Sequence, residues 1–172
     1  GAVKSIAIDP DNKYLVTCSV FSNLDKVVQI WDMQTGYLVC ILDNEEDHCI
    51  SSLLIAGKHE QLVTGSCGAM FKLWDMKTGK LVHKITDRYS IPSSLDMVMA
   101  FDDKYLLFSH DKNTRVWDMD ASTSWIAFGT RETLVESLFV SLDKAKLLVL
   151  ALDGCIEGYD MSGRLLHVHS FG

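Results

Sequence analysis

Hydrophobic and polar residues alternate in short runs along the chain. Residues 3–8 (VKSIAI) and 28–31 (VQIW) alternate, and residues 14–17 (YLVT) are rich in strand-forming side chains. Such runs, bounded by turn residues every eight to twelve positions or so, are typical of an all-β array. The longest apolar run, residues 147–152, has the length of a strand, well short of a membrane helix. The pattern predicts strands throughout and no membrane-spanning segment.

An internal repeat organises these strands. The triplet Trp-Asp-Met occurs three times and a weaker fourth copy, Tyr-Asp-Met, follows, at intervals of 43, 43 and 42 residues. The copies begin with Trp31-Asp32, Trp74-Asp75, Trp117-Asp118 and Tyr159-Asp160. A second marker, a serine followed by Ile or Leu, keeps the same register at Ser5, Ser52, Ser94 and Ser137. Two markers in step over four copies predict four units of similar structure.

The local pattern predicts four strands, a to d, in each unit. In the second unit these are residues 49–57, 61–67, 70–76 and 80–86. Asp and Asn side chains in residues 9–13 and 102–104 predict turns between strands a and b. Gly36, Gly79 and Gly163 follow the triplets, where a hairpin needs a residue at positive φ. The third unit has Asp120-Ala121-Ser122 there, so we expect a different turn.

These features resemble the WD40-repeat family across essentially the whole chain. In that family each repeat forms one four-stranded antiparallel blade of a β-propeller. The resemblance implies one domain, residues 1–172, with blades at about 1–43, 44–87, 88–131 and 132–172. It also implies a polar network that joins a His before strand a, a Ser or Thr on strand b and an Asp in the b–c turn to the Trp.

The network is incomplete in this sequence. The resemblance assigns its Asp to Asp25, Asp111 and Asp153, while Gly68 stands at that position in the second unit. No His lies at the expected offset, and His48 is the nearest. Because buried polar groups are costly when unpaired, a Trp or Asp without the His must find another partner or water. We therefore expect a divergent member with less stable blades.

Four units are fewer than the seven or eight blades that propellers of this family typically have. Because the chain begins at a strand a and ends after a strand d, we expect a partial propeller, completed by further blades of the same parent chain. Pairing of two copies into one ring is the alternative. The D-M-x-T-G turns and the incomplete network also resemble the WD arrays of NACHT-type signalling ATPases.

Composition argues against several classes of partner. The net charge of −7 and a pI near 5.2 disfavour nucleic acid, which wants a basic face. Lys77, Lys80, Lys84 and Arg88 form only a modest basic cluster. The five cysteines contain no C-x-x-C pair, so we expect free thiols in a reducing compartment, the cytoplasm.

Catalytic and metal-binding motifs are missing from the sequence. It contains no G-x-x-x-x-G-K-S/T loop, G-x-G-x-x-G turn, G-x-S-x-G elbow or H-E-x-x-H pair. His167 and His169 share one strand face without a third ligand, and the acidic residues 43–48 lack the spacing of a calcium loop. We predict no catalytic residue, cofactor or metal site, and hence no enzyme.

The leading hypothesis is a protein-interaction scaffold without nucleic-acid or membrane partners. The resemblance implies that partners bind the propeller face made by the d–a and b–c loops, where rigid strands hold variable loops. By position, the candidate partner-binding residues are Lys4, Phe21, Leu24, Asp47, Arg88, Tyr89, His110, Arg131 and Glu136. The alternative is a sensor or autoinhibitory array within a multidomain signalling NTPase.

Overall fold

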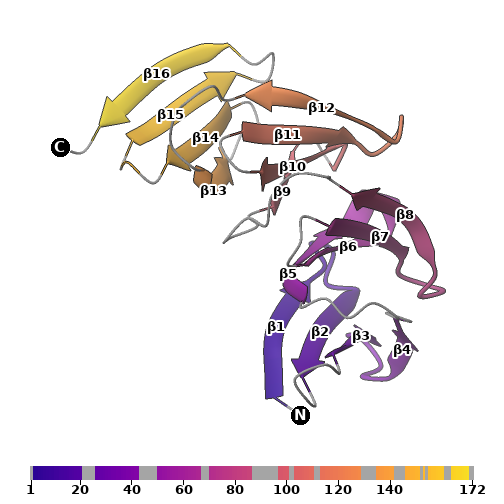
Figure 1. Ribbon diagram of the computed structural model, residues 1–172. Coiled ribbons are helices and arrows are strands. Elements are labelled where there is room, and N and C mark those ends of the chain that lie inside the picture. The colour runs from indigo at the N-terminus through magenta and orange to yellow at the C-terminus, as the bar shows by residue number, and fades with distance from the viewer. Residues whose placement is uncertain are drawn as a thin grey trace. The chain divides into compact units, whose positions relative to one another are not determined.

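The computed structural model describes residues 2–20, 26–42, 50–66, 70–86, 97–100, 103–110, 113–128, 135–141, 146–151, 153, 155–160 and 164–170. Over these residues the backbone forms strands and one short 3₁₀ turn (Figure 1). The strands make four antiparallel sheets of four strands each. The predicted all-β class is confirmed.

Each sheet follows the chain in the order a to d. The first contains β1 (Ala2–Ile8), β2 (Tyr14–Val20), β3 (Lys26–Asp32) and β4 (Leu38–Ile41). The second contains β5 (Ile50–Ala56), β6 (Gln61–Ser66), β7 (Met70–Asp75) and β8 (Leu81–Thr86), with the 3₁₀ turn η1 (Gly57–His59) after β5. The third contains β9 (Met97–Ala100), β10 (Tyr105–His110), β11 (Asn113–Asp118) and β12 (Thr123–Phe128). The fourth contains β13 (Val135–Val140), β14 (Lys146–Ala151), β15 (Cys155–Asp160) and β16 (Leu165–Ser170).

The aromatic residue of the repeated triplet has the same partner in every sheet. It lies near the end of strand c and faces a leucine near the start of strand b. The four pairs are Leu15 with Trp31, Leu62 with Trp74, Leu106 with Trp117, and Leu147 with Tyr159. Cross-strand partners point to the same face of a sheet. The triplet therefore marks one face of each blade, and the WD40-type blade is confirmed.

The chain divides into two compact units, Gly1–Ser93 and Ser94–Gly172, each with two sheets. The core of the first unit joins Val16, Val28 and Ile30 of the first sheet to Leu62 and Trp74 of the second. In the second unit, residues that include Leu107 and Val116 of the third sheet form one cluster with Leu138, Leu147 and Tyr159 of the fourth. In both units the aromatic face of the later blade packs against the earlier blade.

The aromatic face of the first blade is more open. Trp31 is only half-buried there, and Ile6 and Ile8 on the same face are 60% and 54% exposed. The register places them on this face, because Ile8 lies opposite Leu15 and Leu15 lies opposite Trp31. No described residue covers these two isoleucines, so the first blade presents apolar surface to solvent.

A carboxylate shapes the turn that follows the triplet. In the first blade, Asp32 Oδ1 accepts the backbone N–H groups of Gln34 at 3.0 Å and Thr35 at 2.7 Å, and the Thr35 hydroxyl at 2.8 Å. The second blade repeats this pattern around Asp75. Gly36 at φ +73° and Gly79 at φ +70° close the two turns, which confirms their prediction; Gly163 lies outside the described residues.

The expectation of a different turn in the third blade is wrong. Asp118 Oδ1 accepts the N–H groups of Asp120 and Ala121, each at 2.9 Å. The N–H of Ser122 donates to the Asp118 carbonyl at 2.9 Å, as the glycine N–H does in the first two blades. Ser122 itself takes the left-handed conformation, φ +54°. The hydrogen bonds to the aspartate determine the shape of this turn, and a glycine at its last position only lowers the conformational energy of the positive φ.

Candidate functional site

The indole groups of the first two blades bond a hydroxyl on strand b. Trp31 Nε1 donates to Thr17 Oγ1 at 3.1 Å, and Trp74 Nε1 donates to Thr64 Oγ1 at 2.9 Å. Each threonine stands two residues after the leucine that faces the Trp. In these two blades the strand-b hydroxyl is therefore joined to the Trp, as the resemblance to the WD40-repeat family implied.

The last two blades have no threonine at this position of strand b. In the third blade Phe108 stands two residues after Leu106, where the first two blades have Thr. In the fourth blade the Tyr159 hydroxyl donates to the buried Glu157 carboxylate at 2.7 Å. Asp153 Oδ1 accepts the Cys155 N–H at 3.0 Å within the b–c turn. The other network positions, Asp25, Asp111, Gly68 and His48, lie outside the described residues.

Three of the nine predicted partner-binding residues belong to the described part of the chain. Lys4 lies near the start of β1, Glu136 near the start of β13, and His110 at the end of β10. In an antiparallel sheet all three positions lie at the end of the blade where the b–c turn opens. We call this the b–c end, and we call the opposite end of the blade, where the a–b turn lies, the a–b end. The other candidates, Phe21, Leu24, Asp47, Arg88, Tyr89 and Arg131, lie outside the described residues.

Lys4 and Glu136 occupy equivalent β-bulges. In β1, Val3 pairs with Ser19 and Ser5 pairs with Cys18, so Lys4 is the extra residue. In β13, Val135 pairs with Ala151 and Ser137 pairs with Leu150, so Glu136 is the extra residue. Both side chains are exposed. A bulge removes one residue from the ladder and redirects its side chain, so the first and fourth blades each present a charged group beside the b–c end.

A third bulge shows what the serine marker of the repeat means. In β5, Ile50 pairs with Ser66 and Ser52 pairs with Gly65, so Ser51 is the extra residue. In each of these three strands the marker serine is the residue at which pairing resumes. The sequence showed the marker, but period-two alternation alone does not reveal a bulge, because the extra residue shifts the pairing without changing residue type.

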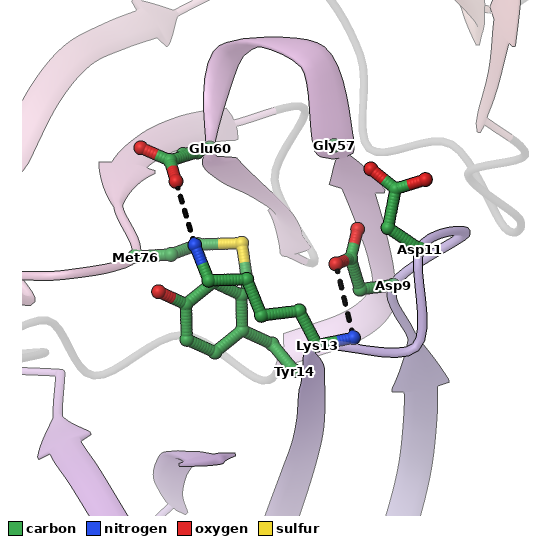
Figure 2. Close-up of a pocket in the computed structure, with 7 residues that line it drawn as sticks. All are labelled: Asp9, Asp11, Lys13, Tyr14, Gly57, Glu60 and Met76. Carbon is green, nitrogen blue, oxygen red and sulfur yellow. Dashed lines mark hydrogen bonds and ion pairs between the residues drawn. The ribbon is translucent and has the colours of Figure 1, made fainter. Parts of the chain in front are cut away.

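A cavity of about 70 Å³ opens at the a–b end of the first unit. Three turns build it: the β1–β2 turn, the η1 turn of the second blade and the turn after β7. We name it the Asp9 pocket, and its lining residues are Asp9, Asp11, Lys13, Tyr14, Gly57, Glu60 and Met76 (Figure 2). The sequence predicted only a turn at residues 9–13, since contacts between residues so far apart in the chain leave no local pattern.

Glu60, which lines this pocket, forms ion pairs with two lysines. Lys13 Nζ lies 2.9 Å from Glu60 Oε1, and Lys77 Nζ forms an ion pair with Glu60 Oε2. The hydrogen bonds from Lys77 and then Lys13 lower the pKa of the Glu60 carboxyl, and the bond to Glu60 raises the pKa of Lys13. Lys13 Nζ also stands 4.8 Å from the centre of the Tyr14 ring. These exposed pairs fix the two a–b turns side by side, with modest stabilisation.

The described residues contain no group of three or more His, Cys, Asp and Glu side chains that could hold a metal ion. The His167 and His169 rings lie 5.5 Å apart on the edge strand β16. None of the helices in the described part of the chain is long and apolar enough to cross a membrane.

Comparison with known proteins places the chain among WD-repeat sequences. The family profile described as "WD domain, G-beta repeat" matches residues 1–32. The chain is 22% identical over 166 residues to THO complex subunit 6 of Arabidopsis thaliana, covering 95% of this chain and 43% of that protein. It is 24% identical over 161 residues to a WD repeat-containing protein 55 homolog of Drosophila willistoni, covering 92% and 30%.

A third relative is more similar but much longer. The chain is 39% identical over 169 residues to apoptotic protease-activating factor 1 of Rattus norvegicus, covering 97% of this chain and 13% of that protein. The chain spans less than half the length of each of these three relatives. The repeat register, the four blades and the WD-repeat relatives agree: this chain belongs to the WD40-repeat family.

Proposed function

We propose that the chain is a non-catalytic scaffold that binds protein partners at the b–c end of its blades, through the d–a and b–c loops. The observation that carries the proposal is the pair of equivalent bulges at Lys4 and Glu136, where two blades expose charges of opposite sign. In each of these two blades an antiparallel sheet holds the charged side chain, so a partner that binds at the b–c end of that blade needs to order little of it.

The relatives support a role in assembly. One of them is, by its name, a subunit of the THO complex, and WD-repeat proteins generally bind other proteins. Cys40 and Cys155 are free cysteines; they support a reducing compartment, and we propose the cytoplasm. Fluorescence microscopy of the tagged full-length protein tests this location; a secreted or exclusively nuclear protein would contradict it.

Charge reversal tests the proposed surface. Affinity capture with the full 172-residue chain, followed by quantitative mass spectrometry, compares Lys4→Glu and Glu136→Lys with the wild type. Lys146→Glu and Asp120→Lys are matched controls, since both residues are exposed at the a–b end. We expect a partner that the wild type and both controls recover and that one b–c variant depletes about tenfold, the equivalent of about 1.4 kcal/mol. Equal depletion by controls and b–c variants would refute the assignment.

We also propose that the open face of the first blade packs against a further blade of the same parent chain. The exposure of Ile6 and Ile8 supports this, because contiguous exposed apolar residues mark contact surfaces. The full-length transcript tests it: another unit of about 43 residues before this segment is expected. A parent chain without further WD units, or pairing of two copies on this face, would overturn it.

The alternative role is a sensor or autoinhibitory array of a multidomain signalling NTPase. The observation in its favour is the 39% identity to an apoptotic protease-activating factor, of which this chain matches only 13%. The same transcript decides between the two roles. A G-x-x-x-x-G-K-S/T phosphate loop in the parent chain would favour the sensor, and its absence would remove that alternative.

A further inference from the structure

The edge strand β16 carries two imidazole side chains on one face of the fourth sheet. The register pairs His167 with Gly158 and His169 with Ile156, and residues two apart on a strand point to the same side of the sheet. The ring centroids of the two histidines lie 5.5 Å apart and the ring planes meet at 61°. Both residues are exposed, so an ion in solution can reach both rings.

Gly158 leaves the space in which the His167 ring lies. A Cβ atom at residue 158 would stand 2.5 Å from both Cε1 and Nε2 of His167. The ring therefore occupies space that the side chain of any other residue at this position would fill. Because the sheet holds the ring close to the backbone of β15, the imidazole has less rotamer freedom to lose when a ligand binds.

The second blade has a single histidine at the equivalent place. His83 in β8 lies opposite Leu73, the residue before the triplet. In the fourth blade His167 lies opposite Gly158, which also precedes the triplet. Two positions after His83 stands Ile85 instead of a second histidine. The second blade therefore offers a comparison that has one imidazole, and a leucine where the fourth blade has glycine.

The separation of the two rings suits a shared metal ion. At a metal–nitrogen distance of about 2.0–2.1 Å, a tetrahedral ion bound to two imidazoles brings the ring centroids to about 5 Å from each other, close to the 5.5 Å in this structure. Imidazole nitrogen is a preferred ligand of Zn²⁺, Ni²⁺ and Cu²⁺, whereas Ca²⁺ and Mg²⁺ prefer oxygen ligands. The pair therefore favours a divalent transition-metal ion.

We propose that His167 and His169 form a two-histidine site for a divalent transition-metal ion, with the His167 ring held over Gly158. The sequence argued against a metal here because a third ligand is missing, and the described residues supply no third His, Cys, Asp or Glu. Water then completes the coordination, so binding is weaker than in a structural site with four protein ligands. Once one imidazole holds the ion, the other binds it as an intramolecular ligand, which raises the affinity above that of a single histidine. This site needs no protein partner, so it is independent of the proposed function.

Nickel binding tests the proposal. The full chain, free of any affinity tag, is titrated with Ni²⁺ in a calorimeter, and equilibrium dialysis measures the bound metal. We expect saturable binding that is about tenfold weaker in both His167→Gln and His169→Gln. The matched control His83→Gln should leave the affinity unchanged, and an excess of Ca²⁺ or Mg²⁺ should not displace Ni²⁺. An affinity that neither β16 variant lowers, or that His83→Gln lowers as much, would overturn the proposal.

A change under the ring tests the geometry of the pair separately from its composition. Gly158→Ala keeps both imidazoles but places a methyl group where the His167 ring lies, so the ring must move and Ni²⁺ binding should weaken severalfold. Ser170→Ala, at the end of the same strand, is the control and should bind Ni²⁺ like the wild type. If circular dichroism shows that Gly158→Ala does not fold, the two histidine variants decide. Wild-type affinity in a folded Gly158→Ala chain would refute the assigned geometry.

Discussion

The buried hydrogen bond between Trp74 and Thr64 gives the sharpest test of how these blades are stabilised. The donor and acceptor atoms lie 2.9 Å apart, and the two residues are 2% and 4% exposed. Thr64→Val replaces the hydroxyl with a methyl group of similar volume and leaves the indole N–H where water does not reach it. A buried donor without its acceptor costs about 1–3 kcal/mol, and we expect that loss of unfolding free energy.

The first blade supplies the matched comparison. Trp31 donates to Thr17 at 3.1 Å, but both residues are only half-buried. Water can replace the lost hydroxyl there, so Thr17→Val should cost less, about 0.5–1 kcal/mol. For a compact unit of the size of Gly1–Ser93, each 1 kcal/mol corresponds to a melting-temperature shift of about 4–8 °C.

Urea denaturation followed by circular dichroism measures both variants. A double-mutant cycle with Trp74→Phe isolates the hydrogen bond, since Thr64→Val should cost almost nothing once the indole is gone. An equal loss of unfolding free energy in Thr17→Val and Thr64→Val would contradict this prediction. A loss from Thr64→Val that persists in the Trp74→Phe background would contradict it too.

Three further predictions concern the turns, the fourth blade and the response to acid. Gly36→Ala should lower the unfolding free energy by about 1 kcal/mol, because alanine is strained at positive φ. Gly79→Ala should lower it more, because its Cβ would also lie 3.3 Å from atoms of strand β4 in the first blade. Equal melting temperatures of the two variants would contradict this. Tyr159→Phe removes a buried hydrogen bond to the Glu157 carboxylate and should cost about 1.5–3 kcal/mol in urea denaturation, and a loss below 0.5 kcal/mol would count against it. The pKa of Glu60 is lowered in the folded chain, so the ionised carboxylate stabilises the fold above its unfolded pKa, and this stabilisation is lost as pH falls below about 4. Glu60→Gln should therefore make the melting temperature depend less on pH in acid. A profile of melting temperature against pH that is the same as in the wild type would contradict a stabilising role of the ion pairs.

The blades could be predicted because their signals are local. Alternation over six residues, an aspartate that accepts N–H groups two and three residues later, and a fixed interval between markers all act within one unit. The strands predicted for the second unit differ from β5 to β8 by one residue at each end at most. The turn at Ser122 was mispredicted because its signal is the aspartate, which accepts the N–H groups of the turn, and not the glycine that the other blades have there.

The pocket and the bulges could not be predicted in the same way. The ion pair between Lys13 and Glu60 joins residues 47 positions apart, and only the packing of one blade on the next brings them together. The alternation of hydrophobic and polar residues also divides a strand into two faces, but it does not show which face another blade covers. In β1 the small residue Ala7 contacts the core, whereas Ile6 and Ile8 are exposed, the reverse of what hydrophobicity alone suggests.

The proposed function places partners at the b–c end of the blades. Hydrogen–deuterium exchange of the chain, with and without a partner that passes the charge-reversal controls, shows which segments a partner covers. We predict slower exchange in peptides that span residues 2–5, the segment between β2 and β3, and residues 135–138. Protection confined to the a–b and c–d turns, with the b–c end unchanged, would contradict it.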